Sequence, residues 1–226
     1  MRINKMRLKN FRCFSNLELD FSGNITLLSS TKFQERSAVL DAIRIALWPY
    51  VSSFDLAHTG NNDPGNNISI EDIHVTWDSR RNRQIRHLPV EVEVCGDYGN
   101  GKNETWMRYR KSDVKNSSTR EDKSTKRLRG WARKIQAKIR QPEAVDITLP
   151  VFGYYSPNKK WPERNSLGVL KEEDLTDDPD FYIRTFGYRN CLNPNYPYKH
   201  FKEWYVWASE SLNEQLLKKL KGNHQA

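Results

Sequence analysis

The sequence predicts an α/β fold with mixed sheets, and three segments carry that prediction. Residues 25–30, ITLLSS, begin with a continuous apolar run, which is typical of a strand covered on both faces. Residues 37–48 place apolar side chains at helical spacing, and Pro49 is expected to end that helix. Residues 89–95, PVEVEVC, alternate between apolar and polar side chains, as a half-buried strand does.

Two further strands are expected before residue 25. Residues 2–11, RINKMRLKNF, intersperse apolar and basic side chains, and residues 17–21, LELDF, form a second short strand. Gly23 and Asn24 supply the turn that leads into the apolar segment.

The middle of the chain predicts a separate antiparallel patch. Residues 58–67 are rich in turn formers and read as a loop. Strands are expected at 71–77, 89–95 and 105–110, with 96–104 as a hairpin loop between the last two. These three strands are expected to form a sheet beside the first unit.

A basic amphipathic helix is predicted over residues 126–140, after a polar segment at 111–127. Its apolar face consists of Leu128, Trp131, Ala132, Ile135 and Ile139. Three interpretations stay open: a solvated basic face, a contact surface for a phosphate backbone, and a membrane-surface helix. The candidate nucleic-acid contacts are Arg129, Arg133, Lys134, Lys138 and Arg140.

The C-terminal third predicts a buried strand, a loop and a long helix. The strand is expected at 146–156, and residues 172–180 form an acidic loop. Residues 201–221 carry one apolar stripe, as in the first turns of a coiled coil. The expected division is a lobe at 1–198 and an amphipathic C-terminal helix at 199–226.

Charge and composition narrow the classes of function. The 226 residues carry a formal net charge of +9, which favours polyanionic partners. The cysteines, at positions 13, 95 and 191, lie far apart, which argues against a disulfide framework or a zinc site. No signal peptide and no apolar run of membrane-spanning length occur, so the expected location is the cytoplasm, without membrane contact.

Residues 24–43 have the layout of a phosphate-binding loop, namely a strand, a polar turn and a helix. Such loops need glycines, which let successive N–H groups point at the phosphates. Here Ser30, Phe33 and Glu35 occupy glycine positions, and Arg36 replaces the usual lysine. A carboxylate about 4 Å from a phosphate costs on the order of 1–4 kcal/mol. The candidate contacts are Ser30, Thr31, Lys32, Gln34, Arg36 and Ser37, with Ser37 as the magnesium ligand if nucleotide binds.

The N-terminal third resembles the first half of RecF/SMC-like ATPase heads of the ABC type. Asn10, Phe11, Arg12 and Phe14 match the N-F-R-x-F element of that family, and residues 40–43 match its L-D-A-I helix. The resemblance implies that Asn10, Phe11 and Arg12 lie at the nucleotide site, with Arg12 close to the nucleotide. It also implies the N-terminal lobe of a head, ending in a long helix that starts a coiled-coil-like insertion.

Two later segments resemble AAA-family ATPases of anti-phage defence modules, of the retron- and Septu-associated (PtuA-like) type. They are 149–161, LPVFGYYSPNKKW, and 187–204, GYRNCLNPNYPYKHFKEW. Residues 156–159, SPNK, stand where that family tends to have G-T-G-R. The second half of the family's heads carries an L-S-G-G-like signature and a strand ending in Asp-Glu, and neither occurs in the 226 residues.

These observations predict a catalytically incomplete ATPase-like protein that needs no cofactor and binds Mg-ATP weakly or not at all. Hydrolysis is not expected, because phosphoryl transfer lacks its metal-holding and water-orienting groups. The expected role is protein interaction, as a regulator or decoy of a full-length defence ATPase, or self-association. The alternatives are an ATP-binding subunit of a defence system and a DNA- or RNA-binding module that uses helix 126–140.

Overall fold

The computed structural model describes residues 1–57, 64–115, 117–141, 147–155, 179, 183–193, 209 and 213. The chain divides into two compact units. The first combines Met1–Lys159 with Arg184–Pro194, and the second combines Lys160–Ile183 with Asn195–Ala226. Most of the second unit, including nearly all of the predicted helix 201–221 and the acidic loop 172–180, lies outside the described residues.

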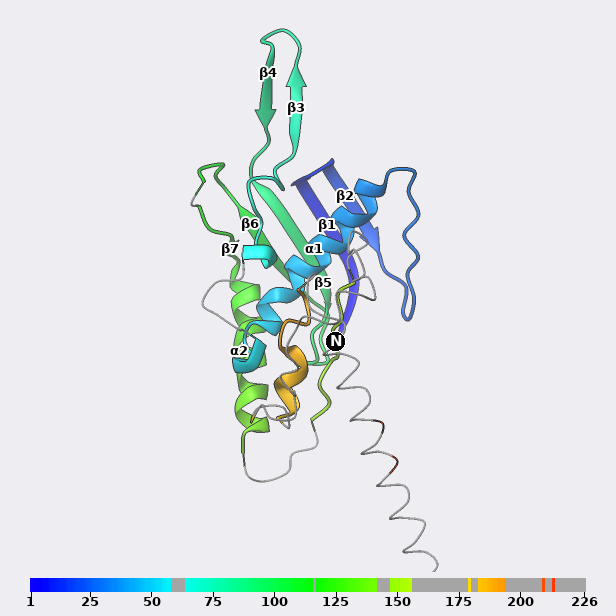
Figure 1. Cartoon of the computed structure of the whole chain (residues 1–226), viewed down its shortest axis with the longest axis vertical. Coiled ribbons are helices and arrows are strands. Elements are labelled where there is room, and N and C mark those ends of the chain that lie inside the picture. The colour runs from blue at the N-terminus through cyan, green and yellow to red at the C-terminus, as the bar shows by residue number, and fades with distance from the viewer. Residues whose placement is uncertain are drawn as a thin grey trace, which may run out of the picture. The chain divides into compact units, whose positions relative to one another are not determined.

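The first unit is built on one antiparallel sheet in the order β2-β1-β5-β6-β7, as Figure 1 shows. Its strands are β1 (Arg2–Phe11), β2 (Phe14–Asp20), β5 (Val90–Asp97), β6 (Glu104–Arg110) and β7 (Arg120–Glu121). The mixed α/β class that the sequence predicts is confirmed, with antiparallel pairing throughout the strands described.

The prediction of a separate three-stranded patch is wrong. Strand β5 pairs with β1, so the hairpin β5–β6 extends the N-terminal sheet. The register explains this pairing, because buried Met6 lies opposite buried Val94, and buried Leu8 opposite buried Val92. Strand β3 (Val75–Asp78) pairs instead with β4 (Arg83–Arg86), which the sequence did not predict.

The predicted strands at 25–30 and 146–156 are also wrong where they are described. No strand forms at 25–30 or at 147–155. Ile25 is 84% exposed, and Leu27 and Val151 are each 91% exposed. A strand covered on both faces needs hydrogen-bonded neighbours at both edges, and the described sheet gives these segments none.

Helix α1 (Phe33–Val51) begins before the predicted start and runs through Pro49, so the predicted stop is wrong. A proline removes the N–H that would bond the carbonyl four residues earlier, here that of Ile45. That carbonyl instead accepts a hydrogen bond from Arg108 Nη1 at 3.0 Å. Trp106 Nε1 donates to the next carbonyl, that of Ala46, at 2.9 Å. Strand β6 therefore satisfies the one carbonyl that Pro49 leaves open and adds a second contact at Ala46, so the helix can continue.

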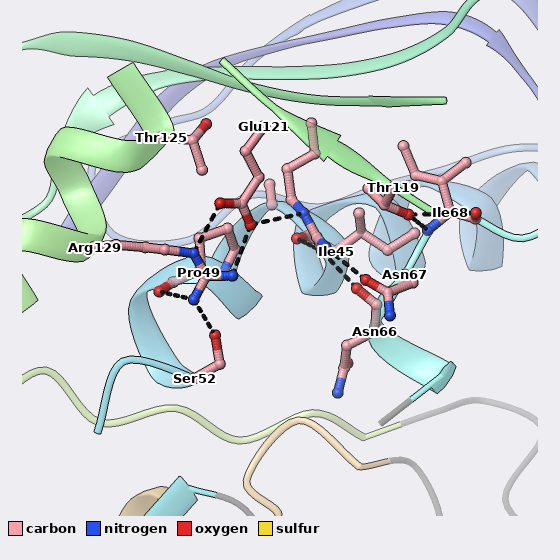
Figure 2. Close-up of polar contacts among 12 residues, drawn as sticks. Ile45, Pro49, Ser52, Asn66, Asn67, Ile68, Thr119, Glu121, Thr125 and Arg129 are labelled. Carbon is pink, nitrogen blue, oxygen red and sulfur yellow. Dashed lines mark hydrogen bonds and ion pairs between the residues drawn. The ribbon is translucent and has the colours of Figure 1, made fainter. Parts of the chain in front are cut away.

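A carboxylate and two arginines fix the end of α1 against the sheet. Arg129 forms a two-pronged ion pair with Glu121, at 2.6 and 2.8 Å. It also donates to the hydroxyl of Ser52 at 2.7 Å and to the carbonyl of Pro49 at 3.3 Å, and Figure 2 shows these contacts. The buried Arg108 lies 3.8 Å from the same carboxylate.

Helix α2 (Lys123–Ile139) confirms the predicted amphipathic helix and begins three residues earlier. The earlier start has a local cause, because the carboxylate of Asp122 accepts from the N–H of Thr125 at 2.7 Å and caps the helix. Leu128, Ala132 and Ile135 are buried, and Trp131 and Ile139 pack partly buried against the core.

Three short 3-10 helices complete the described elements, at Asp55–Ala57, Pro64–Asn66 and Arg184–Tyr188. Within the ranges described, no helix combines the length and the apolar character that crossing a bilayer requires.

Candidate functional site

The turn before α1 is held by its own side chains. The hydroxyl of Ser30 donates to the carboxylate of Glu35, and the guanidinium of Arg36 donates to the carbonyl of Ser30. The N–H of Lys32 donates to the Ser30 hydroxyl at 3.1 Å. The groups that would face a phosphate therefore bond to one another.

The start of α1 has basic side chains, as an anion-binding site does, but the preceding turn lacks the glycines that would expose its backbone N–H groups. Lys32 stands at the N-cap with extended backbone and no capping side chain, and Thr31 and Gln34 are exposed beside it. The Arg36 guanidinium lies 5.8 Å from the centre of the Phe33 ring. Phe33 and Glu35 supply side chains where glycines would let backbone N–H groups approach a phosphate.

The hydroxyl of Ser37, the candidate magnesium ligand, is directed back into the helix. It donates to the carbonyl of Gln34 at 3.1 Å and lies 3.4 Å from that of Phe33. Among the residues described, no group of three or more His, Cys, Asp or Glu side chains is arranged to hold a metal ion.

Arg12 is clamped between two carboxylates from different parts of the chain. Its Nε donates to Asp72 at 2.8 Å, and its Nη1 donates to Asp41 of α1 at 2.6 Å. Burial by itself lowers the pKa of Arg12, but the charge and hydrogen bonds of the two aspartates outweigh it and raise that pKa. The arginine is permanently charged and both of these donors are engaged.

The backbone around Arg12 is also unusual. Asn10 and Arg12 have φ angles of 53° and 49°, in the left-handed region that residues other than glycine and asparagine rarely adopt. Asn10 Nδ2 donates to the carbonyl of Pro89 at 3.0 Å, and buried Phe11 anchors the segment in the core. The N-F-R element therefore forms a fixed corner of the fold.

The two aspartates have further partners. Asp41 accepts from the hydroxyl of Tyr154 at 2.6 Å and pairs with Arg44 at 3.1 Å. The carboxylate of Asp72, a residue only 4% exposed, accepts from the N–H of Ser69 at 2.7 Å. Asp41 lies one helical turn after Ser37. The first turns of α1 therefore contain both the candidate magnesium ligand Ser37 and Asp41, one of the two carboxylates that bind Arg12.

Sequence reasoning singled out Arg12 and missed its partner Asp72 and the contribution of Tyr154. The only signal for Asp72 was an acidic residue beside the apolar Ile73, in a segment interpreted as a strand. Tyr154 belongs to a segment interpreted as a buried strand, which gave no reason to expect a hydroxyl on Asp41.

The five basic candidates on and beside α2 divide into two groups. Arg129 points into the fold toward Glu121, and Arg140 pairs with Asp55 at 2.5 Å. The other three are exposed and form no ion pair within the described part of the chain: Arg133, Lys134 and Lys138.

The mixed α/β arrangement of the sheet and α1 is compatible with a lobe of the AAA superfamily. A family model described as an AAA domain (AAA_23) matches residues 5–222, and the chain belongs to that family. Over 91 residues it is 29% identical to Uncharacterized protein 050L of Invertebrate iridescent virus 6. That match spans 39% of this chain and 9% of the viral protein's length.

Proposed function

We propose that this chain is an ATPase-like lobe that does not turn over ATP at its own phosphate loop and that acts by binding another protein. The partner is a full-length ATPase of the same type, which the chain regulates or imitates as a decoy. The resemblance at 149–161 and 187–204 points to an ATPase of a retron- or Septu-associated defence module.

One observation is the main support for the proposal that this loop does not hydrolyse ATP. Ser30, Glu35 and Arg36 bond to one another across the turn that a nucleotide's phosphates would occupy. Binding would have to break these contacts and place a carboxylate beside the phosphate charge, with no glycine to relieve the backbone. The 226 residues also contain no apolar strand ending in Asp-Glu. The acid that positions magnesium would have to come from another segment or another chain.

The exposed apolar segments support a role in protein binding. Ile25, Leu27 and Val151 are large apolar side chains that are almost fully open to water. Soluble proteins rarely leave such side chains grouped along a segment unless a partner covers them. Within the described part of the chain neither 25–30 nor 147–155 pairs as a strand, so a partner can add ladder hydrogen bonds as well as apolar contact.

The test is co-purification with a complete ATPase of the resembling type, followed by its hydrolysis rate. We expect the wild-type chain to bind that ATPase and to lower its turnover. The double variant Ile25→Asp and Leu27→Asp should lose both effects. The control is Glu18→Gln, which changes an exposed, ion-paired side chain of β2 outside both segments. Equal binding by the double variant and the wild type would refute the proposal.

A second candidate function is nucleotide binding without turnover, which Arg36, Ser37 and the start of α1 favour by their position. Its test is Mg-ATP titration of the wild type and of a repaired loop with Ser30→Gly, Phe33→Gly, Glu35→Gly and Arg36→Lys. A large gain in affinity on repair would assign nucleotide binding to this turn. An unchanged affinity for Mg-ATP after repair would indicate that the turn has a structural role only.

The third candidate is nucleic-acid binding through α2, which the exposed side chains of Arg133, Lys134 and Lys138 favour. It predicts binding that weakens steeply with salt and is lost when these three charges are reversed. Retained binding in the reversed variant would exclude α2 as the surface.

A further inference from the structure

The hairpin β3–β4 is a separate, two-stranded element that stands clear of the main sheet (Figure 1). Its four cross-strand pairs run from Val75 opposite Arg86 to Asp78 opposite Arg83. Every residue in both strands is exposed except Asp78 and Ile85, which are half-buried. A two-stranded hairpin with so little packing is only marginally stable by itself. Its side chains therefore contribute little to the stability of the fold, which leaves them available for a function.

The base of the hairpin is firmly attached to the lobe. Ile73 is 3% exposed and forms a β-bridge with Phe11. The N–H of His74 donates to the carbonyl of Asn10 at 2.9 Å, and the N–H of His87 donates to the carbonyl of His74 at 2.9 Å. The hairpin therefore projects from a fixed point beside the N-F-R corner.

The tip has a defined conformation. The carboxylate of Asp78 accepts from the N–H groups of Arg80 and Arg81, at 3.0 and 3.3 Å. Asn82 adopts a φ angle of 48°, which asparagine tolerates better than most residues. This turn fixes the backbone that presents the arginines at the end of the hairpin.

The charge of the hairpin is strongly positive. Between His74 and His87 the sequence has four arginines and one aspartate, a net charge of +3. Arg80 and Arg83 are exposed and form no ion pair with any described residue. Arg81 lies 4.0 Å from Asp78, at the limit of an ion pair, and its side chain is 69% exposed.

An exposed indole accompanies these charges. Trp77 is 58% exposed and lies opposite Gln84, on the same face as Val75, which is 39% exposed. Arg86, opposite Val75, shares this face, whereas Arg83, opposite Asp78, lies on the other face, and Arg80 and Arg81 lie in the turn at the tip. Large aromatic side chains are normally buried, and an exposed one on a basic element is typical of surfaces that stack on unpaired bases.

We propose that the hairpin β3–β4 binds single-stranded nucleic acid. Arg80, Arg81 and Arg83 contact the phosphate backbone, and Trp77 stacks on a base. The charge complementarity favours a polyanion, and the open indole face favours one with unpaired bases, since the bases of a duplex are stacked on one another. An acidic polypeptide would complement the positive charge of the arginines, but it has no base on which the Trp77 ring could stack. This proposal stands independently of the protein partner proposed above and of α2.

The test is fluorescence anisotropy of a labelled single-stranded oligonucleotide of about 20 nucleotides, titrated with the full chain. The triple variant Arg80→Glu, Arg81→Glu and Arg83→Glu is compared with Arg133→Glu, Lys134→Glu and Lys138→Glu on α2. Both variants change the net charge equally and replace only exposed side chains. Circular dichroism and a thermal melt confirm that each variant is folded.

We expect the hairpin variant to lose binding and the α2 variant to retain most of it. The slope of log K against log salt should fall by about 2 in magnitude in the hairpin variant, as expected for three lost contacts to a single strand. Trp77→Ala should weaken binding about 5- to 150-fold, while Trp77→Phe keeps a stacking ring and most of the affinity. A duplex of the same length and polyglutamate should both bind more weakly than the single strand.

Three results would overturn the proposal. The first is an α2 variant that loses as much affinity as the hairpin variant, since general charge would then explain binding. The second is unchanged binding in Trp77→Ala. The third is polyglutamate or duplex binding as tight as that of the single strand, which would assign the hairpin to an acidic protein or to backbone contact alone.

Discussion

Replacing Glu121 by glutamine removes a carboxylate that Arg108 and Arg129 share. The substitution keeps the shape of the side chain and takes away its charge. Arg129 then keeps the Ser52 hydroxyl and the Pro49 carbonyl, and Arg108 keeps the carbonyls of Ile45 and Asn66 among its neutral acceptors. Both guanidinium groups remain largely buried beside each other without a neighbouring negative charge.

The expected cost is set by that buried positive charge. Removing one partner of a buried ion pair costs about 3–5 kcal/mol, and the lower end applies because glutamine can still accept a hydrogen bond. The side chains of Arg129 and Glu121 are only 22% and 16% exposed, so solvent screens the pair weakly. A loss of about 3 kcal/mol corresponds to a fall in Tm of roughly 6–12 °C for a chain of this size.

The effect also has a defined dependence on pH. Burial by itself raises the pKa of Glu121, but the hydrogen bonds and charge of Arg129 outweigh it, so this pKa lies below its ordinary value. A carboxylate with a lowered pKa stabilises the fold fully above its unfolded pKa of about 4.3. That contribution is lost as the pH falls through the lower, folded value. The difference in stability between wild type and Glu121→Gln should be constant from about pH 5 to 8 and shrink below about pH 4.

The assay is urea unfolding, followed by tryptophan fluorescence at several pH values. Glu18→Gln is the matched control, because Glu18 also pairs with two cations, Lys5 and Arg7, but on the solvent face of the sheet. Its loss should be much smaller than that of Glu121→Gln. A Glu121→Gln variant within about 1 kcal/mol of wild type at pH 7, or a difference that persists unchanged at pH 3, would refute the reasoning.

Three further substitutions test other parts of the lobe. Asp122→Ala removes the cap that bonds the N–H of Thr125 and should cost about 0.5–2 kcal/mol in urea unfolding. Gly96→Ala places a Cβ 2.1 Å from the carbonyl oxygen of Arg2, so it should separate the paired strands and cost about 1–3 kcal/mol or more; a near-neutral result would contradict the register. Arg12→Gln removes the cation that Asp41 and Asp72 share, leaves Asp41 paired with Arg44 alone, and should lower Tm at neutral pH; an unchanged Tm would contradict a structural role of the clamp.

The local elements of this fold could largely be predicted from the sequence, whereas the pairing of its strands could not. The alternation at 89–95 predicts a strand, and the apolar face of 126–140 predicts a helix. Neither pattern says that β5 pairs with β1, because that depends on contacts about 90 residues apart in the chain. The apolar run at 25–30 predicts a strand, but a strand also needs neighbours, and composition does not supply them.

The candidate site shows the same division. Ser30, Phe33 and Glu35 at glycine positions predict from the sequence that side chains obstruct the approach of a phosphate to the backbone. The bonds of Ser30 with Glu35 and with Arg36 are a separate finding that no sequence pattern indicated. The carboxylate partners of Arg12 come from residues 29 and 60 positions away, which no local pattern links to it. The extension of α1 through Pro49 likewise depends on Arg108, a side chain of a distant strand.

The Arg12 clamp adds a cost to nucleotide binding that the loop alone does not reveal. The resemblance to RecF/SMC-like heads places this arginine close to the nucleotide, yet here it donates one charge-assisted hydrogen bond to each of two aspartates. Redirecting it to a phosphate breaks both bonds, each worth about 1.5–3 kcal/mol. The sum, about 3–6 kcal/mol, corresponds to a roughly 10²- to 10⁴-fold loss of affinity, before the new bond to the phosphate offsets part of it. Introducing glycines into the loop would not remove the cost of redirecting Arg12, because Asp41 and Asp72 are held in place by hydrogen bonds from Tyr154 and Ser69. A repaired loop should therefore bind Mg-ATP more weakly than a complete head, and a repaired loop of full affinity would show that the clamp opens at little cost.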